Sequence, residues 1–146
     1  MLKESLYYSK ILLFGEYGII KDSMGLSIPY SDYNGKFLFE NKNNLKSKKS
    51  NQQLFCFLIH LKELDIKNSL PCHLDLVSFE NDLNNNLYFD SSIPQGFGIG
   101  SSGAIVAAVY GKYCVKDKIL SNKDLQNEKI LELKTIFSNL ESYYHG

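Results

Sequence analysis

The sequence predicts a single α+β domain in which strands come first and helices follow. Short runs rich in β-branched and aromatic residues, separated by glycines, occupy the first third of the chain and are typical of strands. Later stretches place apolar residues three and four positions apart, which indicates helices with one buried face. The chain has 146 residues, 44% hydrophobic and 22% charged, as expected for one globular core. We therefore expect residues 1–146 to form one domain with a mixed sheet and packed helices.

Strands are predicted near the N-terminus. Residues 6–20 have strand composition and are interrupted by two glycines, whereas residues 25–30 and 35–40 form shorter runs that each begin with glycine. The intervening residues 31–34 are turn-like. Residues 41–53 are rich in Lys and Asn, and we expect a solvated loop there, either a plain connector or a lid near a site.

A helix and a hairpin are predicted in the middle of the chain. The helix covers residues 53–65, where leucines recur at spacings of four and three. Residues 73–79 and 87–92 have strand composition, and residues 80–86 supply Asn and Asp for a turn between them. The apolar stripe of the helix consists of Leu54, Leu58, Leu61 and Leu64.

Two further helices are predicted in the last third. One covers residues 101–115 and is rich in small side chains. The other begins at about Lys123 and repeats apolar residues at helical spacing. Its predicted apolar face consists of Ile130, Leu133, Ile136, Phe137 and Leu140.

Charge and cysteine content argue against several classes of protein. Nucleic-acid binding is not expected, because the net charge is zero and all 16 basic residues are lysines. The cysteines at positions 56, 72 and 114 include no CxxC pair, so we expect neither a disulfide framework nor a zinc site. Cys56 and Cys114 are expected to behave as small hydrophobes. Without a signal peptide or an apolar run of roughly 20 residues, no membrane contact and a reduced, cytoplasmic location are expected.

The strongest candidate for a ligand site is IPQGFGIGSSGAIVAAVYG, residues 93–111. Its glycines permit positive φ angles and let the backbone approach a bulky ligand. It leads into a predicted helix, whose first N–H groups and dipole favour an anion. Ser101 and Ser102 can cap this helix or reach a phosphate or a metal. We therefore expect a phosphate cradle; the simpler alternative is a glycine-rich turn before a buried helix.

Two common nucleotide motifs fit this loop poorly. A P-loop requires Lys and Ser or Thr after its second glycine, but Ala104 and Ile105 follow Gly103. The dinucleotide-binding pattern G-x-G-x-x-G matches Gly98, Gly100 and Gly103. However, a proline and a glycine stand where an apolar strand should lead into that pattern.

The whole loop resembles the phosphate-binding motif of the GHMP kinases, which include galactokinase, homoserine kinase, mevalonate kinase and phosphomevalonate kinase. PQGFGIGSSGA follows the pattern P-x-G-x-G-x-G-S-S-x-A from Pro94 to Ala104. The resemblance implies that ATP is bound by Pro94, Gly96, Gly98, Ile99, Gly100, Ser101, Ser102 and Gly103.

The N-terminus resembles the first motif of the mevalonate kinases in this superfamily. In that motif a Lys opens a strand that ends in Gly-Glu-His, followed by an apolar step and a glycine. Lys10, Gly15 and Glu16 match this pattern, and Tyr17 replaces the His.

The end of the chain, NLESYYHG, resembles a third element of the same family. There, a helical Glu that binds magnesium precedes a segment H-G-x-x-S-G-x-D, and Glu141, His145 and Gly146 match its beginning. The catalytic Asp of that segment and a C-terminal GHMP domain would follow Gly146. The resemblance therefore implies an N-terminal fragment that does not turn over alone, and a full-length enzyme that can form a homodimer.

The resemblance implies the GHMP kinase N-terminal fold, which is ribosomal protein S5 domain 2-like, and ATP-dependent phosphorylation of a small alcohol. Mevalonate, in isoprenoid precursor biosynthesis, is the expected substrate. Another GHMP kinase, such as a phosphomevalonate or sugar kinase, and a non-catalytic nucleotide-binding fragment are the alternatives. ATP and Mg²⁺ are the implied cofactors.

Four residues take specific roles under this resemblance. Ser102 and Glu141 would ligate Mg²⁺, and Lys10 would neutralise charge near the transferred phosphoryl group. Glu16 would serve as a conformational or substrate-side polar residue. Taken singly, a Lys at a strand start or a Glu on an amphipathic helix is commonly a solvated charge, and it is their joint occurrence with the glycine loop that favours the functional interpretation.

Overall fold

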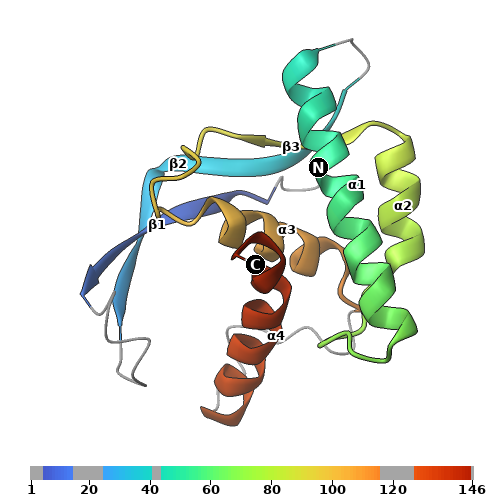
Figure 1. Cartoon of the computed structure of the whole chain (residues 1–146). Helices are drawn as coiled ribbons and strands as arrows, with labels where there is room; N and C mark the ends of the chain where they lie inside the picture. Colours follow the sequence, from blue (N-terminus) through green and yellow to red (C-terminus); the bar gives the residue numbers. More distant parts are fainter. Residues whose placement is uncertain (1–4, 15–24, 41–43, 116–126, 146) are drawn as a thin grey trace.

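The fold is α+β, as the sequence predicts. The computed structural model describes residues 5–14, 25–40, 44–115 and 127–145 (Figure 1). Within these residues, three strands form one antiparallel sheet in the order β1-β2-β3, where a mixed sheet was expected, and four helices accompany it. The elements are β1 Tyr7–Phe14, β2 Leu26–Phe39, α1 Leu45–Ile66, α2 Leu76–Asn84, β3 Leu87–Ser91, α3 Ser101–Tyr113 and α4 Asn127–His145.

The central strand β2 is continuous, so the predicted turn at residues 31–34 is wrong. Strand β2 pairs with β1 between Leu26 and Gly35 and with β3 between Gly35 and Phe39. Between Tyr8 and Ser9 of β1, the partner on β2 changes from Asn34 to Tyr30. Residues 31–33 therefore interrupt the pairing with β1 as a bulge-like irregularity, which bends a strand without ending it.

The predicted loop at residues 41–53 is also wrong over most of its length. Helix α1 begins at Leu45, and the side chain of Asn44 caps it by accepting a 3.0 Å hydrogen bond from the Lys46 amide. Ser50 Oγ bonds to both the amide and the carbonyl of Phe89 on β3, at 3.0 Å each. The polar residues of this segment therefore bind neighbouring backbone, although in the sequence they resemble a solvated connector.

The predicted strand at residues 73–79 is mostly helical, and the predicted hairpin does not form. Asp75 caps α2 by accepting a 2.9 Å hydrogen bond from the Ser78 amide. Leu76, Phe79 and Leu83 then face the core at helical spacing. Strand β3 forms as expected, but it pairs with β2 and not with residues 73–79.

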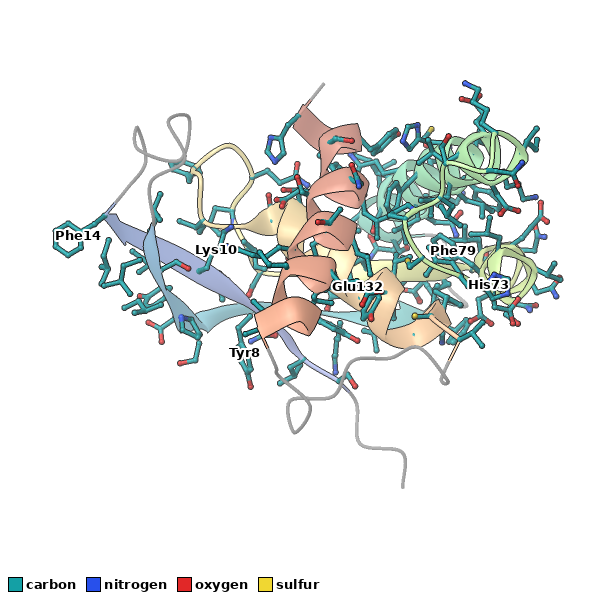
Figure 2. All side chains as sticks on the ribbon, turned by 90° about the horizontal axis from the view of Figure 1, so that it is seen from below. Tyr8, Lys10, Phe14, His73, Phe79 and Glu132 are labelled. Atoms are coloured by element: carbon teal, nitrogen blue, oxygen red, sulfur yellow. The ribbon has the colours of Figure 1, made fainter. Side chains whose placement is uncertain are left out.

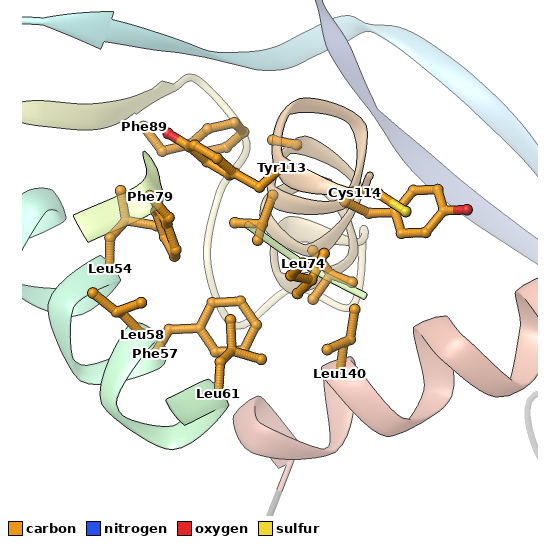
Figure 3. Packing of buried hydrophobic residues seen from close by; sticks show 14 of the residues in the cluster. Leu54, Phe57, Leu58, Leu61, Leu74, Phe79, Phe89, Tyr113, Cys114 and Leu140 are labelled. Atoms are coloured by element: carbon orange, nitrogen blue, oxygen red, sulfur yellow. The ribbon is translucent and has the colours of Figure 1, made fainter. Parts of the chain in front are cut away.

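The sheet and the helices enclose one hydrophobic core. Helix α3 contacts β1 and β2, α1 contacts β3 and α2, and α4 packs against α3 (Figure 1). At the far end of β1, Phe14 points away from the helices and is 72% exposed (Figure 2). Figure 3 shows Phe57 and Leu61 of α1 facing Leu74 and Leu140 across the core.

Helix α4 confirms most of its predicted apolar face. Ile136 and Leu140 are buried, and Leu133 and Phe137 pack against the core, whereas Ile130 is exposed. Residues 116–126 lie outside the described part of the chain, so the expected start near Lys123 is not tested.

The three cysteines are free thiols in different surroundings. Cys114 is buried and Cys72 half-buried, but Cys56 is exposed on α1, contrary to its expected role as a small hydrophobe. None of the helices in the described residues combines the length and apolarity needed to span a membrane.

Candidate functional site

The glycine loop adopts a conformation that depends on its glycines. Gly96, Gly98 and Gly100 have φ angles of +81°, +68° and +86°, in the left-handed region that side chains other than glycine rarely enter. Helix α3 begins directly after Gly100. The first amides of α3 have no hydrogen-bond partners within the helix. They therefore lie next to the backbone of the glycine loop, on the same surface.

Strand β1 positions Lys10 against this loop. The Lys10 amide donates a 2.9 Å hydrogen bond to the Ile99 carbonyl. The Lys10 side chain then crosses Gly100 so closely that a Cβ atom at position 100 would lie 2.9 Å from Lys10 Cγ. Figure 2 shows Lys10 beside the turn that leads into α3. The structure thus brings together two of the predicted site segments, which are some ninety positions apart in the chain.

Helix α4 supplies the carboxylate of the site. Ser102 Oγ donates a 2.8 Å hydrogen bond to Glu141 Oε1. Gly103 lies beside the same carboxylate, since a Cβ there would be in ordinary van der Waals contact with Glu141 Oε1, at 3.5 Å. Ser102 and Glu141, the two predicted metal ligands, are therefore direct neighbours.

His145 lies against both Ser102 and Glu141, and the three side chains form one cluster. The sequence had suggested His145 only through its match to the family motif. Its Nε2 lies 3.2 Å from Ser102 Oγ and 3.5 Å from Glu141 Oε1. The i, i+4 spacing of Glu141 and His145 places both on one face of α4 and was the available signal. Because serine and carboxylate meet the same ring nitrogen, the cluster lacks the relay of a Ser-His-acid hydrolase, in which the acid holds the other nitrogen.

A cavity of about 860 Å³ lies on one side of the start of α3, between β1 and α4. Gly100, which precedes α3, and Gly103 and Ala104 of α3 form part of its wall. Tyr7 also lines it, and burial raises the pKa of its phenol, against a smaller lowering by a hydrogen bond to Ser5. Its charged and polar groups are Lys10, Lys134, Thr135, Ser138, Asn139 and Glu141.

A second cavity, of about 660 Å³, lies on the opposite side of the start of α3, between α1 and the end of α4. The first turns of α1, predicted as a connector or a lid, form one of its walls. Tyr144 lines it, and burial, followed by the neighbouring Tyr143, raises the pKa of Tyr144, so this hydroxyl remains protonated. Its polar groups include Gln53, Gln95, Ser101, Ser102 and His145.

Most of the other predicted nucleotide-binding residues lie at or near these two cavities. Gly96 and Ser101 line the second, whereas Gly98 is exposed and Pro94 and Ile99 are partly buried. Among the residues predicted from the family motifs, Gly15, Glu16, Tyr17 and Gly146 lie outside the described part of the chain.

The donor atoms of Ser102 and Glu141 fit a magnesium ion. Mg²⁺ takes oxygen ligands at about 2.0–2.1 Å in octahedral geometry, which places neighbouring ligand oxygens about 2.9 Å apart. The 2.8 Å between the hydroxyl and carboxylate oxygens agrees with this spacing. Within the described residues, no group of three or more His, Cys, Asp or Glu side chains forms a denser metal site.

Comparison with protein-family models, with curated proteins and with solved structures finds no significant match to this chain. The functional interpretation of the site consequently depends on its geometry and on the sequence motifs that predicted it.

Proposed function

We propose that this chain binds Mg²⁺·ATP over the start of α3 and is the nucleotide-binding part of a kinase that phosphorylates a small alcohol, foremost mevalonate. The observation that carries the proposal is the meeting of Lys10, Gly100, Ser102 and Glu141 at one point between two cavities. The finer fold assignment, to the GHMP kinase N-terminal domain, belongs to the same proposal.

The phosphates would be held mainly by backbone amides. The left-handed glycines leave space beside the loop, because a Cβ at Gly96 or Gly98 would meet no atom within 4 Å. A helix N-terminus reached through such a loop favours an anion through its free N–H groups and its dipole. Lys10 adds a positive charge at the same point. Phosphoryl transfer depends on such neutralisation of phosphate charge more than on covalent chemistry by the protein.

Ser102 and Glu141 would hold the magnesium ion. When bound, the ion supplies positive charge that neutralises the phosphate oxygens and orients them. The hydroxyl and the carboxylate are already held 2.8 Å apart by two different helices, so this pair requires little rearrangement to accept the ion. Glu141 is partly exposed, which leaves it accessible from solvent.

The two cavities suggest separate places for the two substrates. The second cavity reaches Ser101 and Ser102 and carries tyrosines and glutamines suited to a nucleoside. The first cavity reaches Lys10 and Glu141 and carries a second cation, Lys134. A cationic cavity favours an acceptor with a carboxylate, such as mevalonate, over a neutral sugar.

Isothermal titration of the protein with ATP, with and without Mg²⁺, tests the nucleotide part of the proposal. We expect saturable binding that is stronger with Mg²⁺ and weakened in Lys10→Met. Lys67→Met, at the C-terminal end of α1, is the matched control for loss of a positive charge. Absence of saturable binding by the wild-type protein would exclude the proposed nucleotide site.

Phosphoryl transfer is tested separately by coupled ADP release with mevalonate, because the resemblance places the catalytic Asp beyond Gly146. The assay therefore uses a chain that continues through that segment. Turnover with mevalonate supports the kinase proposal. Nucleotide binding without turnover on any alcohol supports the alternative of a non-catalytic nucleotide-binding protein.

A further inference from the structure

We propose that Ser102, Glu141 and His145 together form a three-donor metal site, whose imidazole shifts its preference from Mg²⁺ towards Mn²⁺. The inference deepens the proposed function and rests on it for the roles of Ser102 and Glu141. It adds His145 as a third ligand and names the class of metal, a divalent transition ion that accepts nitrogen.

The three donor atoms form a compact triangle. The sides measure 2.8 Å from Ser102 Oγ to Glu141 Oε1, 3.2 Å from Ser102 Oγ to His145 Nε2, and 3.5 Å from His145 Nε2 to Glu141 Oε1. Atoms that share a metal at about 2.0–2.2 Å lie about 2.9 Å apart at octahedral angles and about 3.4 Å apart at tetrahedral angles. All three sides are close to these values, so one ion can contact all three atoms after small side-chain shifts.

The local structure holds this triangle in place. Glu141 and His145 are four residues apart on α4, so both project from one face, as do the two histidines of H-E-x-x-H metal sites. Ser102 projects from the first turn of α3, and Leu140, next to Glu141, is completely buried and anchors α4. The arrangement therefore depends on two packed helices and not on a loop.

The chemistry of the donor set favours a transition ion. Mg²⁺ strongly prefers oxygen ligands, whereas imidazole suits first-row transition metals such as iron, nickel, copper and zinc. Mn²⁺ shares the preference of Mg²⁺ for carboxylate and water oxygens but begins that transition-metal series, so it suits a set of two oxygens and one imidazole better than Mg²⁺ does. With its proton on Nδ1, the neutral ring presents the Nε2 lone pair towards Ser102 and Glu141. The exposed His145 side chain, at 67%, leaves the remaining coordination positions open to water or phosphate.

Two nearby features limit the affinity for a bare ion. The start of α3 carries the positive end of the helix dipole, and Lys10 lies across Gly100 close by. With one carboxylate to offset them, the site is expected to bind bare Mn²⁺ weakly and to bind it more tightly when a phosphate shares the ion. Mn²⁺ alone and Mn²⁺ with ADP are therefore both used as probes.

The test is pulsed electron paramagnetic resonance of Mn²⁺ bound to the protein, prepared without a histidine tag. We expect modulation from a coordinated imidazole nitrogen in the wild type. The modulation should disappear in His145→Gln, together with at least about a tenfold loss of Mn²⁺ affinity. It should persist in His73→Gln, the matched control, because Figure 2 shows His73 far from Lys10 and the start of α3.

Two results would overturn the inference. One is wild-type protein with no nitrogen modulation, whether or not Mn²⁺ binds, in both the free-ion and the ADP samples. The other is modulation that survives in His145→Gln. Failure of this inference is distinct from failure of the proposed function. If the protein binds Mg²⁺·ATP but Mn²⁺ gives no nitrogen modulation, only the third ligand is refuted. If Mn²⁺ alone gives nitrogen modulation but no nucleotide binds, the nucleotide proposal is refuted.

Discussion

The Ser102 hydroxyl donates a 2.8 Å hydrogen bond to the Glu141 carboxylate, although the two residues lie 39 positions apart in the sequence. This bond joins the first turn of α3 to the last turns of α4. It places a hydroxyl and a carboxylate at the point where the glycine loop ends, between the two cavities. The same pair is therefore available to hold a metal ion that a nucleotide would bring.

Removing either member of this pair should weaken nucleotide binding only in the presence of the metal. We expect Glu141→Gln and Ser102→Ala each to weaken Mg²⁺·ATP binding by about tenfold or more, as loss of metal-site groups commonly does, with little change for metal-free ATP. Titration calorimetry with and without Mg²⁺ measures both. Glu132→Gln removes an exposed charge from the same helix and should leave both affinities unchanged (Figure 2). Equal losses with and without Mg²⁺ would contradict the metal assignment.

The close approach of Lys10 to Gly100 can be separated from backbone strain by two substitutions. Gly96→Ala places a side chain at positive φ where no atom lies within 4 Å, so it should lower the unfolding free energy by about 1–2 kcal/mol through strain alone. Gly100→Ala has a similar φ but also meets Lys10 Cγ, and its loss should be larger. Urea unfolding of both variants measures the difference, which should shrink when Lys10 is also shortened in Lys10→Ala. Equal losses in Gly96→Ala and Gly100→Ala would contradict the steric contact.

Asn51 links three elements through one amide group. Its Nδ2 donates hydrogen bonds to the Leu83 carbonyl at 3.0 Å and to the Leu87 carbonyl at 2.7 Å, which fixes α1 to the end of α2 and the start of β3. Asn51→Ala should lower the unfolding free energy by about 1–3 kcal/mol, because it leaves partly buried carbonyls without this donor. Asn51→Asp should be at least as damaging, since the carboxylate faces the two carbonyls without a donor.

The matched control for Asn51 is Gln52→Ala, on the exposed side of the same helix. Denaturant unfolding should find this variant within the small range typical of surface substitutions. If Gln52→Ala and Asn51→Ala lose equal stability, the loss does not come from the two hydrogen bonds of Asn51, since both changes also raise helix propensity.

The Cys72 thiol should make stability depend on pH in the alkaline range. Burial, and to a smaller degree the neighbouring Cys114, raises the pKa of Cys72 from its ordinary 9.0 to about 12. A group whose pKa is higher in the folded state binds its proton more tightly there, so the stabilisation is complete below 9.0 and is lost as the pH rises towards about 12. The difference in unfolding free energy between wild type and Cys72→Ala should decrease across this window. Iodoacetamide should also label the exposed Cys56 before Cys72.

Hydrophobic periodicity predicted the second half of α1 and much of α4, and the run of small side chains at residues 101–115 predicted α3. It failed where polar residues bind backbone of another element. Ser50 and Asn51 looked like part of a solvated connector, but they bond to β3 and to the end of α2. The alternation of Leu74 and Leu76 resembled a strand, although the capping side chain of Asp75 starts a helix there. Such partners lie far along the chain and cannot be inferred from local spacing.

The candidate site was predictable in its parts more than in its arrangement. The glycine loop, Lys10, Ser102 and Glu141 were recognised from their motifs, and the structure brings them together. The contact of His145 with Ser102 and the two cavities on opposite sides of α3 depend on the docking of α4. That docking is a tertiary property, so no sequence window contains it.

The hydrogen bond from the Lys10 amide to the Ile99 carbonyl also makes the hydrogen exchange of this one amide a measure of loop opening. This proton is protected by the loop and not by the neighbouring strand β2, so it exchanges with deuterium only when the loop detaches from β1. Its protection factor therefore measures how often the candidate site opens. An anion that bridges the loop and Lys10 should slow this one amide while the rest of the sheet keeps its own rates.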